Sequence, residues 1–129
     1  MANIVKKLKD IRKYLDSVPN KTGNEHRKVM EKKIIPDVIA AIGESIENQR
    51  VKDIANNVVI LHFLRTGKMI YKDQLTLSSI ENEMVSIKYT LQSFMVESTI
   101  ILKQEKPSDV LKLTIDISQI VEILISMHK

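Results

Sequence analysis

The stretch LSSIENEMVSIKYTLQSFMVESTIIL, residues 77–102, decides the expected fold of this chain. Its apolar residues recur at alternating spacings of three and four, which places one side chain per turn along one face of an α-helix. This face comprises Leu77, Ile80, Met84, Ile87, Leu91, Phe94, Ser98 and Ile101, of which Ser98 alone is polar. A face of this length is stable only when other helices cover it, so the stretch predicts one long helix within a helical bundle.

The sequence also indicates where this helix begins and ends. Ser78 and Glu81 have the spacing of a capping box, and Asp73 offers an alternative start one turn earlier. Pro107 marks the far end, because proline disfavours helical conformation at the residue before it.

Three further helical segments precede this stretch. The first spans residues 2–18, and its apolar face consists of Ile4, Leu8, Ile11, Leu15 and Val18. The second spans residues 25–47; we expect Pro36 to open a new segment within it rather than to kink a continuous helix. The third spans residues 49–66 and ends before Gly67, a favourable glycine just past a helix C-terminus. Its last turns are almost wholly apolar, which predicts burial on more than one side.

The last segment, residues 108–129, fits two patterns. Its apolar residues follow helical spacing, but residues 111–118 also alternate between apolar and polar as in a strand. We prefer a helix, because no second strand of similar quality exists for pairing. Such a helix is apolar nearly all round, so it either lies at the centre of its own bundle or contacts another subunit. The candidate subunit contacts are Val110, Leu113, Ile117, Ile120, Leu124 and Met127. The predicted fold is therefore a single all-α domain over residues 1–129, an antiparallel bundle of four to five helices.

Charge is distributed unevenly along the chain. Residues 1–35 contain ten Lys and Arg against four Asp and Glu, whereas the other 94 residues contain ten against twelve. A basic segment of this kind suggests contact with a polyanion or with an acidic surface on a partner, which includes a second copy. A merely solvated helix face is the alternative. The candidate contact residues are Lys6, Lys7, Lys9, Arg12, Lys13, Arg27, Lys28, Lys32 and Lys33.

No sequence motif indicates a catalytic, cofactor or metal site. The chain has no cysteine, and its three histidines, His26, His62 and His128, have no partner at metal-ligand spacing. Its three glycines are too scattered for a phosphate-binding loop. Glu81 and Glu83 are better interpreted as helix-surface charge than as a catalytic carboxylate pair. We therefore expect a protein that is not an enzyme, with no cofactor and no small-molecule substrate.

In general character the chain resembles a group of viral structural proteins. It is small, free of cysteine, rich in isoleucine and lysine and basic, and it is predicted to be all-helical. These features resemble the major structural proteins of spindle-shaped or tailed archaeal viruses. The resemblance implies a self-assembling coat or tail subunit located in the virion, with the last helix as a subunit contact. Without it, we expect a cytoplasmic protein.

Two other functions are compatible with the sequence. In size and character the chain also resembles the small helical subunits of CRISPR effector complexes, which implies binding of DNA or RNA backbone phosphates through the basic first third. The third possibility, a membrane surface or a protein partner bound by the amphipathic segment 2–18, is less favoured. The three hypotheses differ in partner: another copy, a nucleic acid or a membrane surface.

Overall fold

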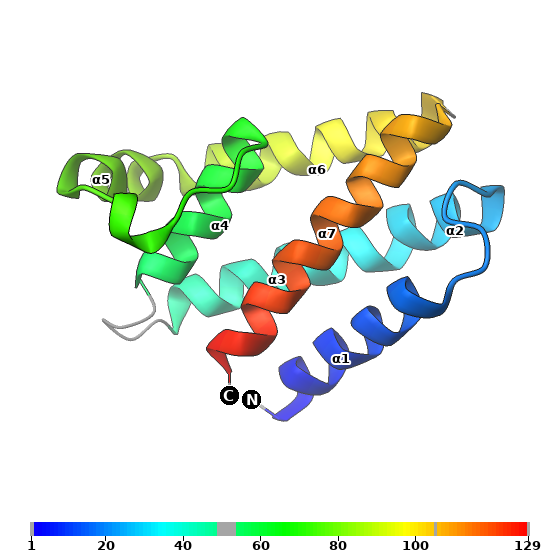
Figure 1. The fold of residues 1–129 in the computed structure, drawn as a ribbon, viewed down its shortest axis with the longest axis horizontal. Helices are drawn as coiled ribbons and strands as arrows, with labels where there is room; N and C mark the ends of the chain where they lie inside the picture. Colours follow the sequence, from blue (N-terminus) through cyan, green and yellow to red (C-terminus); the bar gives the residue numbers. More distant parts are fainter. Residues whose placement is uncertain (1, 49–53, 105, 129) are drawn as a thin grey trace.

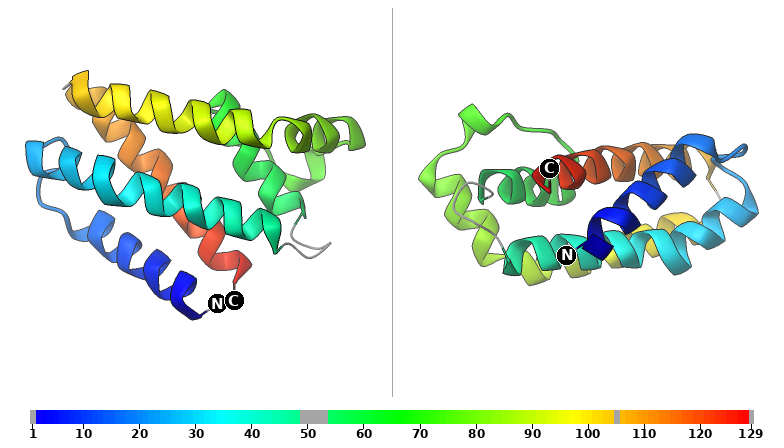
Figure 2. Two further views of the ribbon diagram at one scale, coloured as in Figure 1. Left: turned by 180° about the vertical axis from the view of Figure 1, so that it is seen from behind. Right: turned by 90° about the horizontal axis from the view of Figure 1, so that it is seen from below.

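A computed structural model describes residues 2–48, 54–104 and 106–128 of the chain, and every regular element within them is helical. The predicted all-α fold class is therefore confirmed (Figure 1). The first and last helices run in opposite directions, and the two ends of the chain lie at the same end of the molecule (Figures 1 and 2).

Helix α1 (Ala2–Ser17) has the predicted amphipathic pattern. One side chain per turn is buried on one face, namely Ile4, Leu8, Ile11 and Leu15. This face packs mainly against α7 and also contacts α3. The lysines of α1 lie on its other faces and remain exposed.

The second helical region is one continuous path rather than two segments. It consists of α2 (Asn24–Val29), the π-helix η1 (Met30–Ile34) and α3 (Ile35–Glu47). Pro36 does lie in the first turn of α3, but no loop precedes it. The Ile35 amide donates to the Met30 carbonyl, five residues back. This wider turn accommodates a proline ring that would clash with the carbonyl four residues earlier in an α-helix.

Helix α4 (Ile54–Thr66) is buried on several sides, as its apolar composition predicts. The predicted start of this helix at residues 49–53 lies outside the described residues. Gly67 has φ 74°, and its amide donates to the Phe63 carbonyl over 2.8 Å. Glycine adopts this left-handed conformation without the Cβ penalty of other residues, so the predicted C-terminal glycine is confirmed.

The stretch 77–102 forms two helices, and the prediction of one long helix is wrong. A short 3₁₀ turn, η3 (Lys72–Gln74), precedes α5 (Leu77–Val85), and α6 (Ile87–Gln104) follows. The hydroxyl of Ser86 donates to the Asn82 carbonyl over 3.1 Å, and the backbone of Ser86 (φ −103°, ψ 19°) leaves the helical range. Serine side chains compete in this way with the helical hydrogen bonds. The cap of α5 is Thr76, paired reciprocally with Ser79, rather than Ser78 with Glu81.

Helix α7 (Pro107–Met127) confirms the helical interpretation of the last segment and is the central helix of the bundle. It packs against α1, α3, α4 and α6 (Figure 1). Five of the six predicted subunit contacts are consequently at most 4% exposed, namely Val110, Leu113, Ile117, Ile120 and Leu124. The prediction that they contact another subunit is wrong in this structure, because side chains of the same chain already cover them. Met127 is partly buried and packs against the same core.

Candidate interaction surfaces and polar clusters

Of the nine predicted basic residues, the lysines are exposed, whereas the two arginines form an ion pair or a hydrogen bond with another helix. Arg12 Nη1 lies 3.6 Å from Glu122 Oε1, which joins α1 to α7. Arg27 donates to the Leu102 carbonyl over 3.2 Å, which joins α2 to α6. All seven lysines are exposed: Lys6, Lys7, Lys9 and Lys13 on α1, and Lys28, Lys32 and Lys33 on α2 and η1. The arginines therefore stabilise the tertiary structure, whereas the lysines are accessible to a partner.

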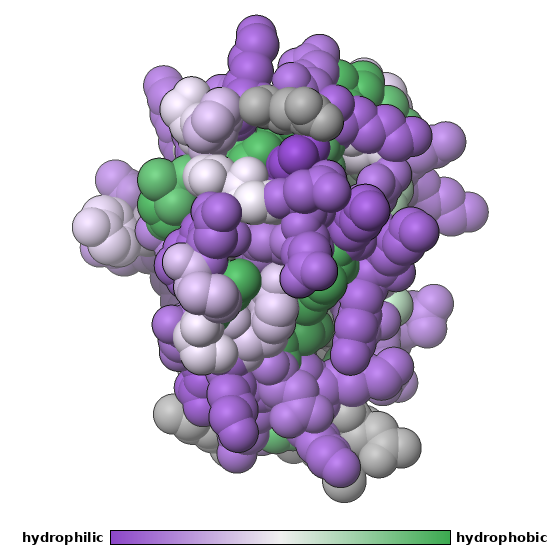
Figure 3. Space-filling view, turned by 90° about the vertical axis from the view of Figure 1, so that its right-hand side faces the viewer, coloured by the Kyte–Doolittle hydropathy of each residue, from purple (hydrophilic) through white to green (hydrophobic). Residues whose placement is uncertain are grey.

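The surface around the exposed lysines is polar and also contains acidic side chains. The end of the molecule that contains α2 and the α6–α7 connection is largely hydrophilic, with small apolar areas between the charged side chains (Figure 3). Lys7, however, lines a cavity of about 270 Å³ together with Asp37 and Glu44 of α3. These carboxylates weaken attraction of a phosphate at that position, so the basic surface is strongest away from α3.

A chain of hydrogen bonds links three helices through the buried side chain of His26. The Tyr14 hydroxyl lies 2.8 Å from His26 Nδ1, and His26 Nε2 lies 2.9 Å from Thr114 Oγ1. The Thr114 hydroxyl donates to the Val110 carbonyl, so its oxygen accepts from His26. His26 is therefore the neutral Nε2–H tautomer, and its Nδ1 accepts from Tyr14. These hydrogen bonds fix α1, α2 and α7 relative to one another.

This arrangement predicts a pH-dependent stability. Burial, and then the positive charge of Lys21, lower the pKa of His26 below its usual value of about 6.5. Burial, and then the negative charge of Glu25, raise the pKa of Tyr14. Between the lowered folded pKa and about 6.5, the unfolded chain binds more protons at residue 26 than the folded chain does. Its contribution to stability is therefore present above about pH 6.5 and is lost as the pH falls through that window.

We expect a steeper loss of unfolding free energy between about pH 8 and pH 5 in the wild-type protein than in the His26→Gln variant. Urea unfolding followed by circular dichroism at each pH measures both slopes. The comparison uses slopes because the substitution also changes the hydrogen bonds at every pH. All other titrating groups are common to both proteins, so equal slopes would contradict the buried, neutral state of His26.

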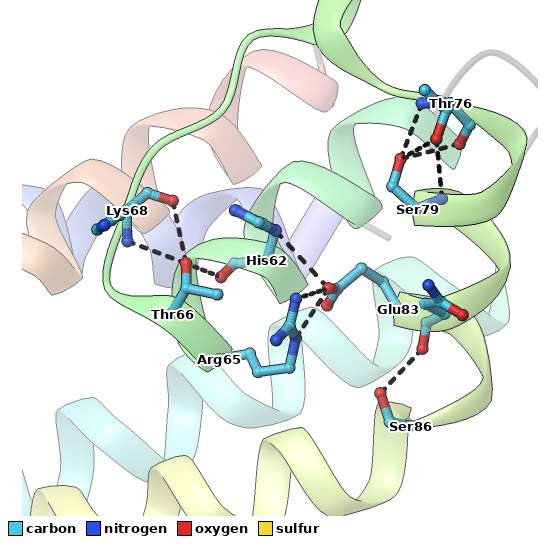
Figure 4. A network of polar contacts seen from close by, with 9 residues as sticks. His62, Arg65, Thr66, Lys68, Thr76, Ser79, Glu83 and Ser86 are labelled. Atoms are coloured by element: carbon cyan, nitrogen blue, oxygen red, sulfur yellow. Dashed lines mark hydrogen bonds and ion pairs between the residues drawn. The ribbon is translucent and has the colours of Figure 1, made fainter.

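A second polar cluster lies between α4 and α5 (Figure 4). Glu83 Oε1 accepts from Arg65 Nε over 2.8 Å and from Arg65 Nη2 over 2.5 Å, and His62 Nδ1 lies 3.6 Å away. These hydrogen bonds to Glu83 hold the pKa of Arg65 above its usual value. Glu83 is only 2% exposed, so the prediction that it is surface charge is wrong, although Glu81 is exposed as expected. Glu83 Oε2 has no hydrogen-bond partner among the described residues.

Exposed apolar side chains are concentrated in one part of the chain. Of nine large apolar residues that the described structure exposes, seven lie between positions 69 and 100. We call these seven the 69–100 surface: Met69, Tyr71, Leu77, Val85, Tyr89, Val96 and Ile100. Tyr71, Leu77, Val85 and Tyr89 are each more than 70% exposed. Tyr89, Val96 and Ile100 share one outward face of α6, while α5 and the preceding segment project beyond α3 (Figures 1 and 2).

The described residues offer no group of three or more His, Asp or Glu side chains that is placed to hold a metal ion. None of the described helices combines the length and apolar character that a membrane crossing requires. Comparison of the chain with protein-family models, with curated proteins and with solved structures gave no match.

Proposed function

We propose that this protein is a non-enzymatic structural subunit that self-assembles through the 69–100 surface. The observation that carries the proposal is the concentration of seven exposed apolar side chains on one segment. Exposed apolar side chains can form protein–protein contacts, because burial of apolar surface is worth roughly 25 cal/mol per Å². The sequence also predicts self-assembly, but on α7; we place the subunit contact on α5, α6 and the segment before them instead.

The finer part of the proposal is a coat or tail subunit of a virion. Its support is the resemblance in composition to archaeal viral structural proteins, together with the all-helical fold. A projecting apolar segment suits such a role, since a repeated subunit needs one surface that binds an identical neighbour.

A second proposal is binding of nucleic-acid backbone by the exposed lysines of α1, α2 and η1. Its support is the accessibility of all seven lysines. Such binding is independent of base sequence and weakens steeply as salt is added. The two proposals use different surfaces, so a single set of measurements separates them.

The test is sedimentation of the purified protein over a range of concentration. We expect association that weakens at least about tenfold in the Tyr89→Gln/Val96→Gln variant, which removes apolar surface without changing charge. The matched control is Leu111→Gln/Ile115→Gln, which alters two exposed apolar residues of α7 instead. We expect this control to associate like the wild type.

Several outcomes would count against self-assembly through this surface. One is a wild-type protein that stays monomeric at every concentration; another is equal weakening in both variants. A protein that gains mass only when duplex DNA or RNA is added, in a salt-dependent manner, would favour the second proposal.

A further inference from the structure

Helix α5 is attached to the bundle through a contact that buries little of its apolar surface. Among the described elements its main neighbour is α4. Of its nine residues only Glu83 is buried, and this carboxylate accepts from Arg65 of α4 while its Oε2 has no partner among the described residues. Leu77 and Val85 are 78% and 88% exposed. An amphipathic helix usually buries its apolar face, whereas α5 buries a charge, so its attachment depends largely on one ion pair.

A single residue, Ser86, separates α5 from α6, and the two helices lie at an angle to each other (Figures 1 and 2). The stretch 77–102 contains neither glycine nor proline, the residues that most often break or kink a helix. Its apolar spacing continues across the break, since Met84, Ile87 and Leu91 are three and four positions apart. The sequence is therefore compatible with a second form, in which Ser86 is helical and α5 and α6 are one straight helix.

The connection between α4 and α5 is long enough to permit this change. It spans residues 67–76 and includes η3. A segment of this length reaches up to about 33 Å when extended, whereas α5 is only about 14 Å long. Helix α5 can therefore turn about Ser86 and leave α4, while α4 and α6 keep their places in the bundle.

The straight form leaves two surfaces uncovered. Ile80 and Met84, which are partly buried in the bent form, lose their cover when α5 extends away from α4. Helix α4, which is buried on several sides, loses one of its neighbours. A second copy in the straight form supplies both missing partners, because its α5 fits α4 and its α4 fits α5. The same opposite charges, Arg65 and Glu83, then pair two copies.

We propose that two copies of the chain exchange α5, so that the α5 of each copy packs on the α4 of the other. This exchange rests on the proposed self-assembly and specifies the contact that produces it. Exchange of an identical element is a low-cost route to a dimer, because the contacts of the closed chain form again between the copies. The surface of α4 that α5 leaves matches that helix in shape and, through Arg65 and Glu83, in charge. Its partner is therefore a second copy.

The test reverses the ion pair in two separate chains. Arg65→Glu places two acidic groups at the contact and Glu83→Arg places two basic groups there, so neither variant forms the pair within its own chain. In a mixture, exchange pairs opposite charges at both contacts of a heterodimer and at neither contact of a homodimer. One variant is isotope-labelled, and native mass spectrometry measures the amount of each dimer. Random pairing gives about twice as much heterodimer as either homodimer, whereas we expect at least about tenfold more.

The matched control reverses an ion pair that cannot be exchanged. Lys112 and Asp116 lie four positions apart on α7, with Lys112 Nζ 3.0 Å from Asp116 Oδ2. Lys112→Asp and Asp116→Lys, mixed in the same way, should pair at random. Random pairing of the Arg65→Glu and Glu83→Arg variants as well would overturn the exchange and leave self-assembly in place. A wild-type protein that does not associate at any concentration would overturn both.

A second measurement serves if the charge-reversed chains are poorly folded. The chain has no cysteine, so the Ser78→Cys/Gln104→Cys variant carries one spin label at each of two exposed positions. With an excess of unlabelled wild-type protein, electron paramagnetic resonance measures the distance between the labels of one chain. These positions are about 39 Å apart in one straight helix and closer in the bent form. We expect the longer distance only at concentrations where the protein associates. The same shorter distance in monomer and assembly would overturn the exchange.

Discussion

Replacing Ile120 with alanine is expected to lower the free energy of unfolding by roughly 3–4 kcal/mol, within the range measured for large-to-small changes in packed cores. Ile120 is fully buried on α7, which contacts four other helices. With helices packed around this position, the surroundings cannot collapse to fill the space, so most of the cavity remains. Urea unfolding followed by circular dichroism measures the loss, provided that the dependence on urea concentration is unchanged.

The matched control is Ile115→Ala on the same helix. Ile115 is 49% exposed, so we expect a change within about 0.5 kcal/mol. The loss at Ile120 should also be the same at every protein concentration. A subunit contact would behave differently, since stability that comes from association varies with concentration. A concentration-dependent loss, or one below about 1 kcal/mol, would restore the interpretation of α7 as a subunit contact.

The example of α7 shows what helical periodicity can and cannot predict. The spacing of its apolar residues identified a helix that is apolar nearly all round, and the structure confirms it. Periodicity indicates that an apolar face must be covered, but it does not indicate whether helices of the same chain or another subunit cover it. The alternatives of a central helix and a subunit contact therefore stayed open until α1, α3, α4 and α6 were placed around it.

In the stretch 77–102, by contrast, periodicity predicts the wrong number of helices. Its spacing continues in register through Ser86, so the pattern predicts one helix where two form. The break depends on one hydroxyl and on local backbone angles, to which a count of apolar positions is insensitive. The resulting change of direction also explains why Leu77, the first residue of the predicted apolar face, is exposed.

The polar clusters were missed because they join residues that are distant in sequence. His26 and Thr114 are 88 positions apart, and Arg65 and Glu83 are 18 apart. One signal for Glu83 was present: Ile80 lies three positions before it, so the glutamate shares a helix face with an apolar residue of α5. A charged residue within an apolar face needs a partner when it is buried, and the sequence does not name that partner.

The second large effect is expected for Arg65→Met. This change removes the only arginine or lysine within ion-pair distance of Glu83 among the described residues, and leaves a carboxylate that is 2% exposed. Removing one partner of a buried ion pair typically costs about 3–5 kcal/mol. We expect the lower end, about 3 kcal/mol, because the Arg65 side chain is itself 47% exposed and water screens the pair.

The reverse change, Glu83→Met, should cost less, because Arg65 can turn its charge towards water while methionine fills the buried space. The decisive protein is the double variant Arg65→Met/Glu83→Met, which contains neither charge. Since a buried pair replaced by apolar residues is often close to neutral in stability, we expect the double variant to be more stable than Arg65→Met alone. Urea unfolding of all four proteins gives the interaction energy from the double-mutant cycle. If the two losses simply add, the Glu83 carboxylate is not held in a buried site by Arg65. A partial rescue would instead show that the cost lies in the uncompensated charge of the buried Glu83 carboxylate, which in the wild-type protein accepts from Arg65 Nε and Nη2.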